Sequence, residues 1–182
     1  MSVFIVGQST GVIAQEYVLD DCHFSFFDPY NGRADVDNES SVHSASYIAS
    51  IERGEAHSVG EVSIVFVCKT ALGQKAFSNK GIAHDNGEWG VIPDKSDPEN
   101  LANLKVYSLR GNDVDGAAIT YVQTTGEEDR RVQGIGFCLT NQKQILCGTS
   151  EAVGYVAYPK QSSLPKVLEL LKSIKFFEPV SP

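Results

Sequence analysis

The sequence lacks the motifs that mark metal and cofactor sites. It has no Cys-x-x-Cys pair, no cysteine–histidine spacing that suits zinc, and no G-x-x-x-x-G-K-[ST] phosphate loop. Gly134 and Gly136 form a G-x-G, but no helical pattern opens after them, so a dinucleotide site has no support. No run approaches the roughly 18 apolar residues that a membrane span requires. We therefore expect no cofactor, no metal ion and no membrane contact.

Basic residues are scarce in the first third of the chain. Residues 1–61 contain ten acidic side chains and two basic ones, whereas residues 62–182 contain thirteen of each. The whole net charge of −8 therefore belongs to the first third. Such a chain is a poor partner for nucleic acid, while a surface of one sign speeds encounter with a partner of the other. The charge favours a basic protein partner; the alternative is that the acids only keep the chain soluble.

One segment matches a catalytic pattern. Gly7–Gly11 reads G-x-S-x-G, the turn that exposes a serine nucleophile in α/β-hydrolases. In those enzymes several strands precede the turn, but here only the short strand-like run Ser2–Val6 does. No histidine with a carboxylate is evidently placed to serve Ser9. We expect no enzymatic activity and keep a serine hydrolase through Ser9 as an alternative.

The last fifty residues carry the clearest structural pattern. Two strand-like runs flank the polar segment Asn141–Gln144, which predicts a hairpin with a four-residue loop and with Cys138 level with Cys147. A third run, Val153–Tyr158, alternates along its length and predicts a further strand that Pro159 ends.

An amphipathic helix is predicted after Pro159. Ser162 or Ser163 can cap it, because a serine oxygen accepts from the first unpaired amides, and Pro165 suits the first turn. The apolar residues recur at three- and four-residue steps and form one stripe that needs a sheet to pack on; they are Leu164, Val167, Leu168, Leu171 and Ile174.

Most of the remaining chain also reads as strands. Thr70–Asn79 and Val12–Leu19 are ambiguous between helix and strand, and Arg33–His43 and Pro93–Asn103 are predicted as exposed loops. Glu61–Lys69 is the most apolar strand and should be central, and Asp85-Asn86-Gly87 predicts a hairpin turn. Together the patterns predict one α+β domain over residues 1–182, with a mainly antiparallel sheet and the C-terminal helix packed on one face. The other predicted strands are His23–Phe27, Ala45–Ile51, Lys105–Leu109, Ala117–Gln123 and Arg131–Leu139.

The cysteines and the N-terminus bear on the cellular compartment. The apolar start of the chain has no Lys or Arg before it and is broken by glycines, unlike a secretory signal peptide. We therefore expect a cytoplasmic protein whose four cysteines are small, mostly buried hydrophobic residues. A Cys138–Cys147 bridge and a periplasmic location stay open, the latter if the N-terminus is a trimmed signal peptide.

Two segments carry a resemblance to a known family. Leu171–Phe176 reads L-x-S-I-K-F after a hairpin, a strand and a helix, and Cys22–Pro29 is an aromatic strand that ends in proline. This layout resembles the Mog1/PsbP-like α+β proteins over about a third of the chain. The acidic segment and the Pro93–Asn103 loop depart from it. The resemblance implies a non-enzymatic binding protein, such as a secretion chaperone or an immunity protein that blocks a bacterial toxin.

Charge and resemblance together predict an immunity or inhibitor protein that neutralises a basic toxin domain. Its partner surface is predicted at four acids, Asp28, Asp35, Asp37 and Glu39. The alternative is a chaperone or small-ligand-binding module that uses the sheet face opposite the helix. The oligomeric state stays open.

Overall fold

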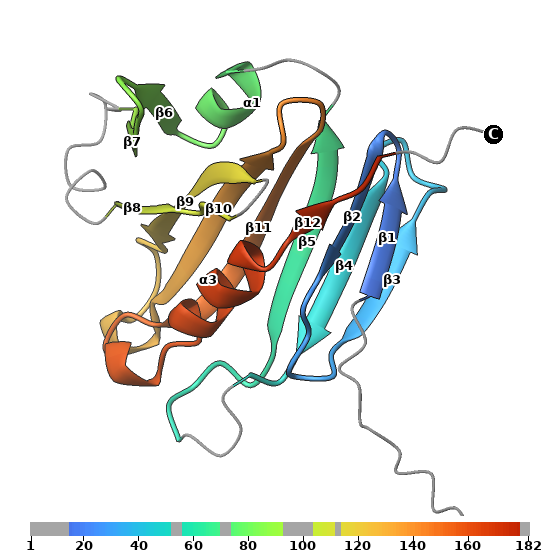
Figure 1. Ribbon diagram of the computed structural model, residues 1–182. Helices are drawn as coiled ribbons and strands as arrows, with labels where there is room; N and C mark the ends of the chain where they lie inside the picture. Colours follow the sequence, from blue (N-terminus) through green and yellow to red (C-terminus); the bar gives the residue numbers. More distant parts are fainter. Residues whose placement is uncertain (1–14, 52–55, 70–73, 93–103, 112–113, 179–182) are drawn as a thin grey trace, which may run out of the picture.

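Seven strands form the largest sheet of the molecule. The computed structural model describes residues 15–51, 56–69, 74–92, 104–111 and 114–178. The strands are β3 (Arg33–Asp37), β4 (Ser44–Ala49), β5 (Val62–Lys69), β8 (Lys105–Ser108), β9 (Asp115–Val122), β10 (Val132–Thr140) and β11 (Ile145–Tyr155). Their order across the sheet is β3-β4-β5-β11-β10-β9-β8, and every neighbouring pair is antiparallel (Figure 1). The mainly antiparallel sheet is the one that the sequence predicts.

Strand β5 lies inside this sheet, between β4 and β11, as its apolar sequence predicts. Its side chains alternate between two very different environments. Ile64 and Phe66 have no exposed surface, whereas Val65 between them is 37 % exposed. One face of the strand therefore carries the core, and the other stays open to solvent.

The hairpin of β10 and β11 has the predicted register. Cys138 stands opposite Cys147, and Thr140 pairs with Ile145 on either side of the four-residue loop. The prediction of a separate third strand at Val153–Tyr158 is wrong, because β11 runs without interruption to Tyr155. A bulge explains the broken pattern: residues 151–153 of β11 stand opposite Gly134 alone, so the alternation shifts within one strand.

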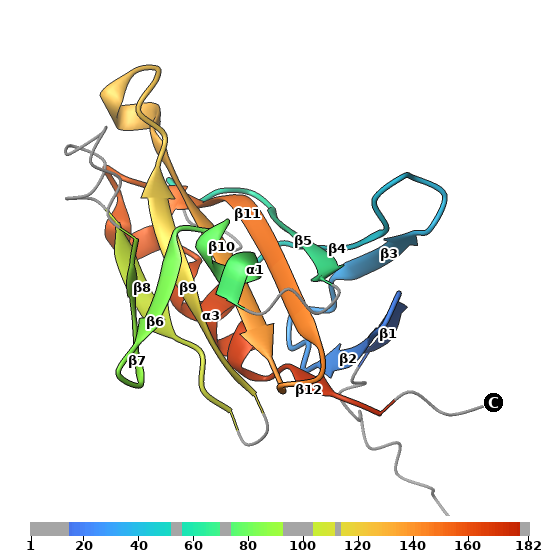
Figure 2. The ribbon, with the colours of Figure 1, turned by 90° about the horizontal axis from the view of Figure 1, so that it is seen from above.

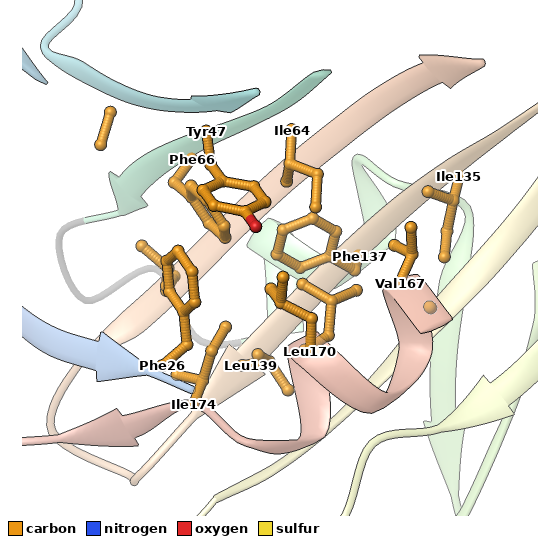
Figure 3. Close-up of a cluster of buried hydrophobic side chains, with 14 of the residues drawn as sticks. Phe26, Tyr47, Ile64, Phe66, Ile135, Phe137, Leu139, Val167, Leu170 and Ile174 are labelled. Carbon is orange, nitrogen blue, oxygen red and sulfur yellow. The ribbon is translucent and has the colours of Figure 1, made fainter. Parts of the chain in front are cut away.

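A small sheet and the C-terminal helix lie on one face of the large sheet. The small sheet has the order β1-β2-β12, from β1 (Gln15–Leu19), β2 (Cys22–Phe26) and β12 (Lys175–Phe176). Figure 2 shows β1 and β2 in a layer apart from β3 and β4. The helix, α3 (Leu164–Lys172), buries Val167, Leu170 and Leu171 in one cluster with Phe66 and Phe137 (Figure 3).

The start of α3 follows the predicted signals in part, since the side chain of the N-cap residue, Ser163, makes no capping hydrogen bond. The Ser162 hydroxyl accepts a hydrogen bond from the Leu164 amide at 3.2 Å, and Pro165 occupies the first turn. After the helix, Ile174 is buried and β12 pairs with β2. Of the tail that carries the family resemblance, the first two residues end α3 and the last two form the third strand of the small sheet.

The opposite face of the large sheet is covered only in part. The helix α1 (Gln74–Ser78) and the hairpin of β6 (Ile82–Asp85) and β7 (Glu88–Val91) pack there on residues of β9, β10 and β11. The turn between β6 and β7 is the predicted one, since Asn86 and Gly87 adopt φ of +51° and +83°.

One predicted loop is a strand. Arg33–His43 was expected to be an exposed loop, but its first five residues form β3 at the edge of the sheet. Only Ala34 of this strand packs against the core. Charged side chains are typical of edge strands, because they discourage pairing with another chain. The polar sequence therefore reflects the position of the strand in the sheet.

Both pairs of cysteines are disulfide-bonded, so the expectation that all four serve only as small, buried hydrophobic residues is wrong, and the Cys138–Cys147 bridge that the sequence left open is formed. Cys138–Cys147 links the two strands of the β10–β11 hairpin, and Cys22–Cys68 links β2 of the small sheet to β5 of the large one. The second bridge joins the two layers. Two strands 46 residues apart in the chain meet there, and spacing alone does not reveal such a contact.

Removing the bridge between the layers should cost more stability than removing the one within the hairpin. On the chain-entropy account, sequence separations of 46 and 9 residues correspond to about 4 and about 3 kcal/mol. We expect Cys22→Ala/Cys68→Ala to lower the free energy of unfolding more than Cys138→Ala/Cys147→Ala, as measured by urea unfolding. The unreduced, denatured protein should show no free thiol on titration; four titratable thiols would contradict the pairing.

Candidate functional site

The turn after β2 is organised around the carboxylate of Asp28. Its Oδ1 accepts from the Tyr30 amide at 2.9 Å, and its Oδ2 accepts from the Gly32 amide at 2.8 Å. Oδ1 also accepts from the hydroxyl of Tyr47. Asp28 is 8 % exposed. Both carboxylate oxygens of Asp28 therefore accept hydrogen bonds from within the protein. The prediction that Asp28 belongs to the partner surface has to be corrected, because this side chain stabilises the turn.

The hydroxyl of Tyr47 donates its hydrogen bond to this carboxylate. Burial, and next the hydrogen bond to Asp28, raise the pKa of Tyr47, so the hydroxyl stays protonated and remains a donor. Its ring meets Phe26 edge-on, with the centroids 5.1 Å apart. A methyl group on Gly32 would lie 2.4 Å from the Tyr47 ring, so the turn can close only with glycine at this position.

The other three predicted acids remain on the surface, and we call them the acidic edge: Asp35, Asp37 and Glu39. Asp35 and Asp37 alternate along the edge strand β3, so both project from the same side, and Glu39 follows in the turn to β4. All three are exposed. The structure thus brings these three together and places Asp28 elsewhere.

The turn after β3 is held by Asp37. Its carboxylate accepts from the Glu39 amide at 2.9 Å and from both the amide and the hydroxyl of Ser40. These bonds, the Ser40 hydroxyl foremost, lower the pKa of Asp37. His43 at the end of the same turn contacts the Asp20 carboxylate through Nδ1. Asp20 lies in the turn between β1 and β2, so a fourth exposed carboxylate lies close to the acidic edge.

The acidic edge borders an uncovered part of the large sheet. Asp35 pairs with Ser46, Ser46 with Val65, and Val65 with Thr149, so these four side chains form one row across β3, β4, β5 and β11. We call Ser46, Val65 and Thr149, with the adjacent Ser44 and Val67, the open face. Each is exposed or half-buried, and none belongs to either hydrophobic cluster.

An aromatic pocket lies on the same face of the sheet, where α1 and the β6–β7 hairpin meet the β10–β11 turn. Trp89 stacks on Phe77 with centroids 4.8 Å apart, and His84 lies 4.3 Å from Trp89 on the hairpin. The pocket has a volume of about 410 Å³. The sequence shows a tryptophan near a turn but not the partners that α1 supplies. The lining residues are Phe77, Ser78, Ile82, Ala83, His84, Trp89, Ile92, Thr140, Gln142 and Ile145.

Ser9 and the Gly7–Gly11 motif lie outside the described residues. In the part of the chain that the structure describes, no three His, Cys, Asp or Glu side chains are grouped to hold a metal ion. No helix among the described residues combines the length and the apolar character that crossing a membrane demands.

The chain matches no family model and no curated protein.

Asp28 and Asp35 should respond differently to the same substitution. Asp28→Ala leaves the buried Tyr47 hydroxyl without its acceptor, and we expect a loss of about 2 kcal/mol in the free energy of unfolding. Asp35→Ala removes an exposed carboxylate and should change stability by less than about 0.5 kcal/mol. Chemical unfolding of the two variants at pH 7 provides the comparison. Equal decreases in the free energy of unfolding would show that the hydrogen bonds of Asp28 stabilise the protein no more than the exposed Asp35 carboxylate does.

Proposed function

We propose that residues 1–182 form a single α+β domain that acts as an immunity or inhibitor protein and blocks a basic toxin domain without doing chemistry itself. The observation that carries the proposal is that Asp35 and Asp37 project together from an edge strand whose neighbours form the open face. Glu39 extends the same edge. An acidic border beside a solvent-exposed sheet suits a protein partner that is basic at its rim.

The two disulfides support a location outside the cytoplasm. Disulfides persist in oxidising compartments and are rare in the cytosol, where thiols are kept reduced. Both pairs here are nearly or fully buried, with Cys68 the most exposed cysteine at 8 %. The proposed protein therefore meets its toxin in an oxidising compartment such as the periplasm.

Protection and binding both test this function. We expect a gene for a basic toxin domain beside this gene, and we expect bacteria that receive that domain to survive when they also produce this chain. Changing Asp35, Asp37 and Glu39 together to Lys should slow association with that domain by about tenfold or more at low salt, because steering depends on these charges. The measurement is surface plasmon resonance over a series of salt concentrations.

A matched variant controls for net charge. The exposed acids Glu127, Glu128 and Asp129 lie at the β9–β10 connection, so changing them to Lys alters the net charge equally at another place. This control should bind the toxin domain almost as the unchanged chain does. An unaltered association rate in the acidic-edge variant, or an equal loss in the control, would contradict the surface.

A small-ligand-binding module is the second candidate, and the aromatic pocket favours it. Ligand pockets are mostly apolar and measure roughly 300–1,000 Å³, and this one falls in that range at about 410 Å³. It lies on the sheet face opposite α3, which is the face predicted for such a module.

The single tryptophan makes this second candidate measurable. If the pocket binds apolar molecules, fluorescence energy transfer from Trp89 to a neutral apolar dye, N-phenyl-1-naphthylamine, should rise with dye concentration and saturate. Ala83→Leu narrows the pocket and should weaken the transfer, whereas Ala157→Leu on the exposed surface should not. Transfer that does not saturate, or that Ala83→Leu leaves unchanged, would rule out the pocket as the binding place.

A further inference from the structure

Two lysines are among the residues that line a second cavity, at the border between the open face and α1. Lys69 is the last residue of β5, and Lys80 follows the C-terminus of α1. Together with Asn79 and Thr149 they line a cavity of about 250 Å³, and the Cys147 half of a disulfide forms part of its wall. No acidic residue of the described chain is among the residues that line it.

Neither lysine forms an ion pair with a carboxylate in the part of the chain that the structure describes. Among the residues that the structure describes, no Asp or Glu oxygen lies within 4.0 Å of the ammonium group of Lys69 or Lys80. The side-chain amide of Asn79 and the hydroxyl of Thr149 likewise have no hydrogen-bond partner in that part of the chain. Four groups that can donate hydrogen bonds therefore line one small space, and none of their side chains has a protein partner among the residues that the structure describes.

Lys80 is the less exposed of the two lysines. Its Cδ lies where a methyl group on Gly136 would be 3.7 Å away, so its aliphatic stem runs over the backbone of β10. Burial, and next the charge of Lys69, lower the pKa of Lys80. Two neighbouring cations repel each other, and no carboxylate of the described residues pairs with either of them. A bound anion would offset this repulsion.

We propose that this cavity binds a small oxyanion, a phosphate or a carboxylate, between the ammonium groups of Lys69 and Lys80. Asn79 and Thr149 supply further donors to its oxygen atoms. The volume is below the roughly 300–1,000 Å³ of pockets that take drug-sized molecules, so the occupant is a single small group. The proposal does not depend on the identity of any protein partner.

The test is titration of the purified, disulfide-intact chain with sodium phosphate and, separately, sodium acetate. Sodium chloride at matched ionic strength is the reference, and amide chemical shifts are the readout. We expect saturable shifts at Asn79, Lys80 and Thr149 with at least one of the two anions. Preference for phosphate indicates a phosphate or phosphate ester as the occupant; preference for acetate indicates a carboxylate, free or on a side chain.

Matched variants give the result that would overturn the proposal. Lys69→Gln and Lys80→Gln should each weaken binding about fivefold or more, from the loss of one unit charge near the anion. Lys80→Arg should retain most of it. Lys172→Gln, at the end of α3, removes the same charge from the exposed surface of a helix that packs on the other face of the sheet and should change nothing. The site is refuted if neither anion exceeds chloride, or if Lys172→Gln weakens binding as much as Lys80→Gln does, and amide spectra show whether each variant is folded.

Discussion

The packing of aromatic rings around Phe66 joins the two layers of this protein. Phe66 projects from β5, and its ring centroid lies 5.5 Å from Phe24, 5.8 Å from Phe26 and 5.6 Å from Phe137. The first two belong to the small sheet and the third to the hairpin. Rings at these separations add specific edge and stacking contacts to the burial of their large apolar surfaces. The Cys22–Cys68 bridge and α3 complete the same cluster.

Local patterns in the sequence were enough to predict much of this architecture. The hairpin around Asn141–Gln144, the turn at Asn86-Gly87 and the helix after Ser162 follow from turn chemistry, proline placement and apolar spacing over a few residues. Contacts between distant segments were missed. The Cys22–Cys68 bridge requires knowing that β2 lies over β5, and β3 is a strand only because β4 pairs with it.

Within the candidate site, the sequence separates exposed from buried carboxylates poorly. Asp28 and Asp35 are both acids near a turn, yet one is buried under Tyr47 and the other is exposed. A local signal did exist for Asp28, since an aspartate followed by proline and, four residues on, by glycine is typical of a side chain that bonds nearby backbone amides. No comparable signal predicted that Lys69 and Lys80 line one cavity, because the last residue of β5 and the segment after α1 come together only in the folded chain.

The large aromatic core lies on one side of β5 only. This arrangement affects which parts of the sequence can change during evolution. Val65 and Val67, on the outward side, belong to neither of the two hydrophobic clusters. Substitutions there can alter shape and polarity while the interior stays intact, since surface changes away from packed groups rarely cost much stability. Such a scaffold can acquire new recognition chemistry by drift on one side without refolding the other.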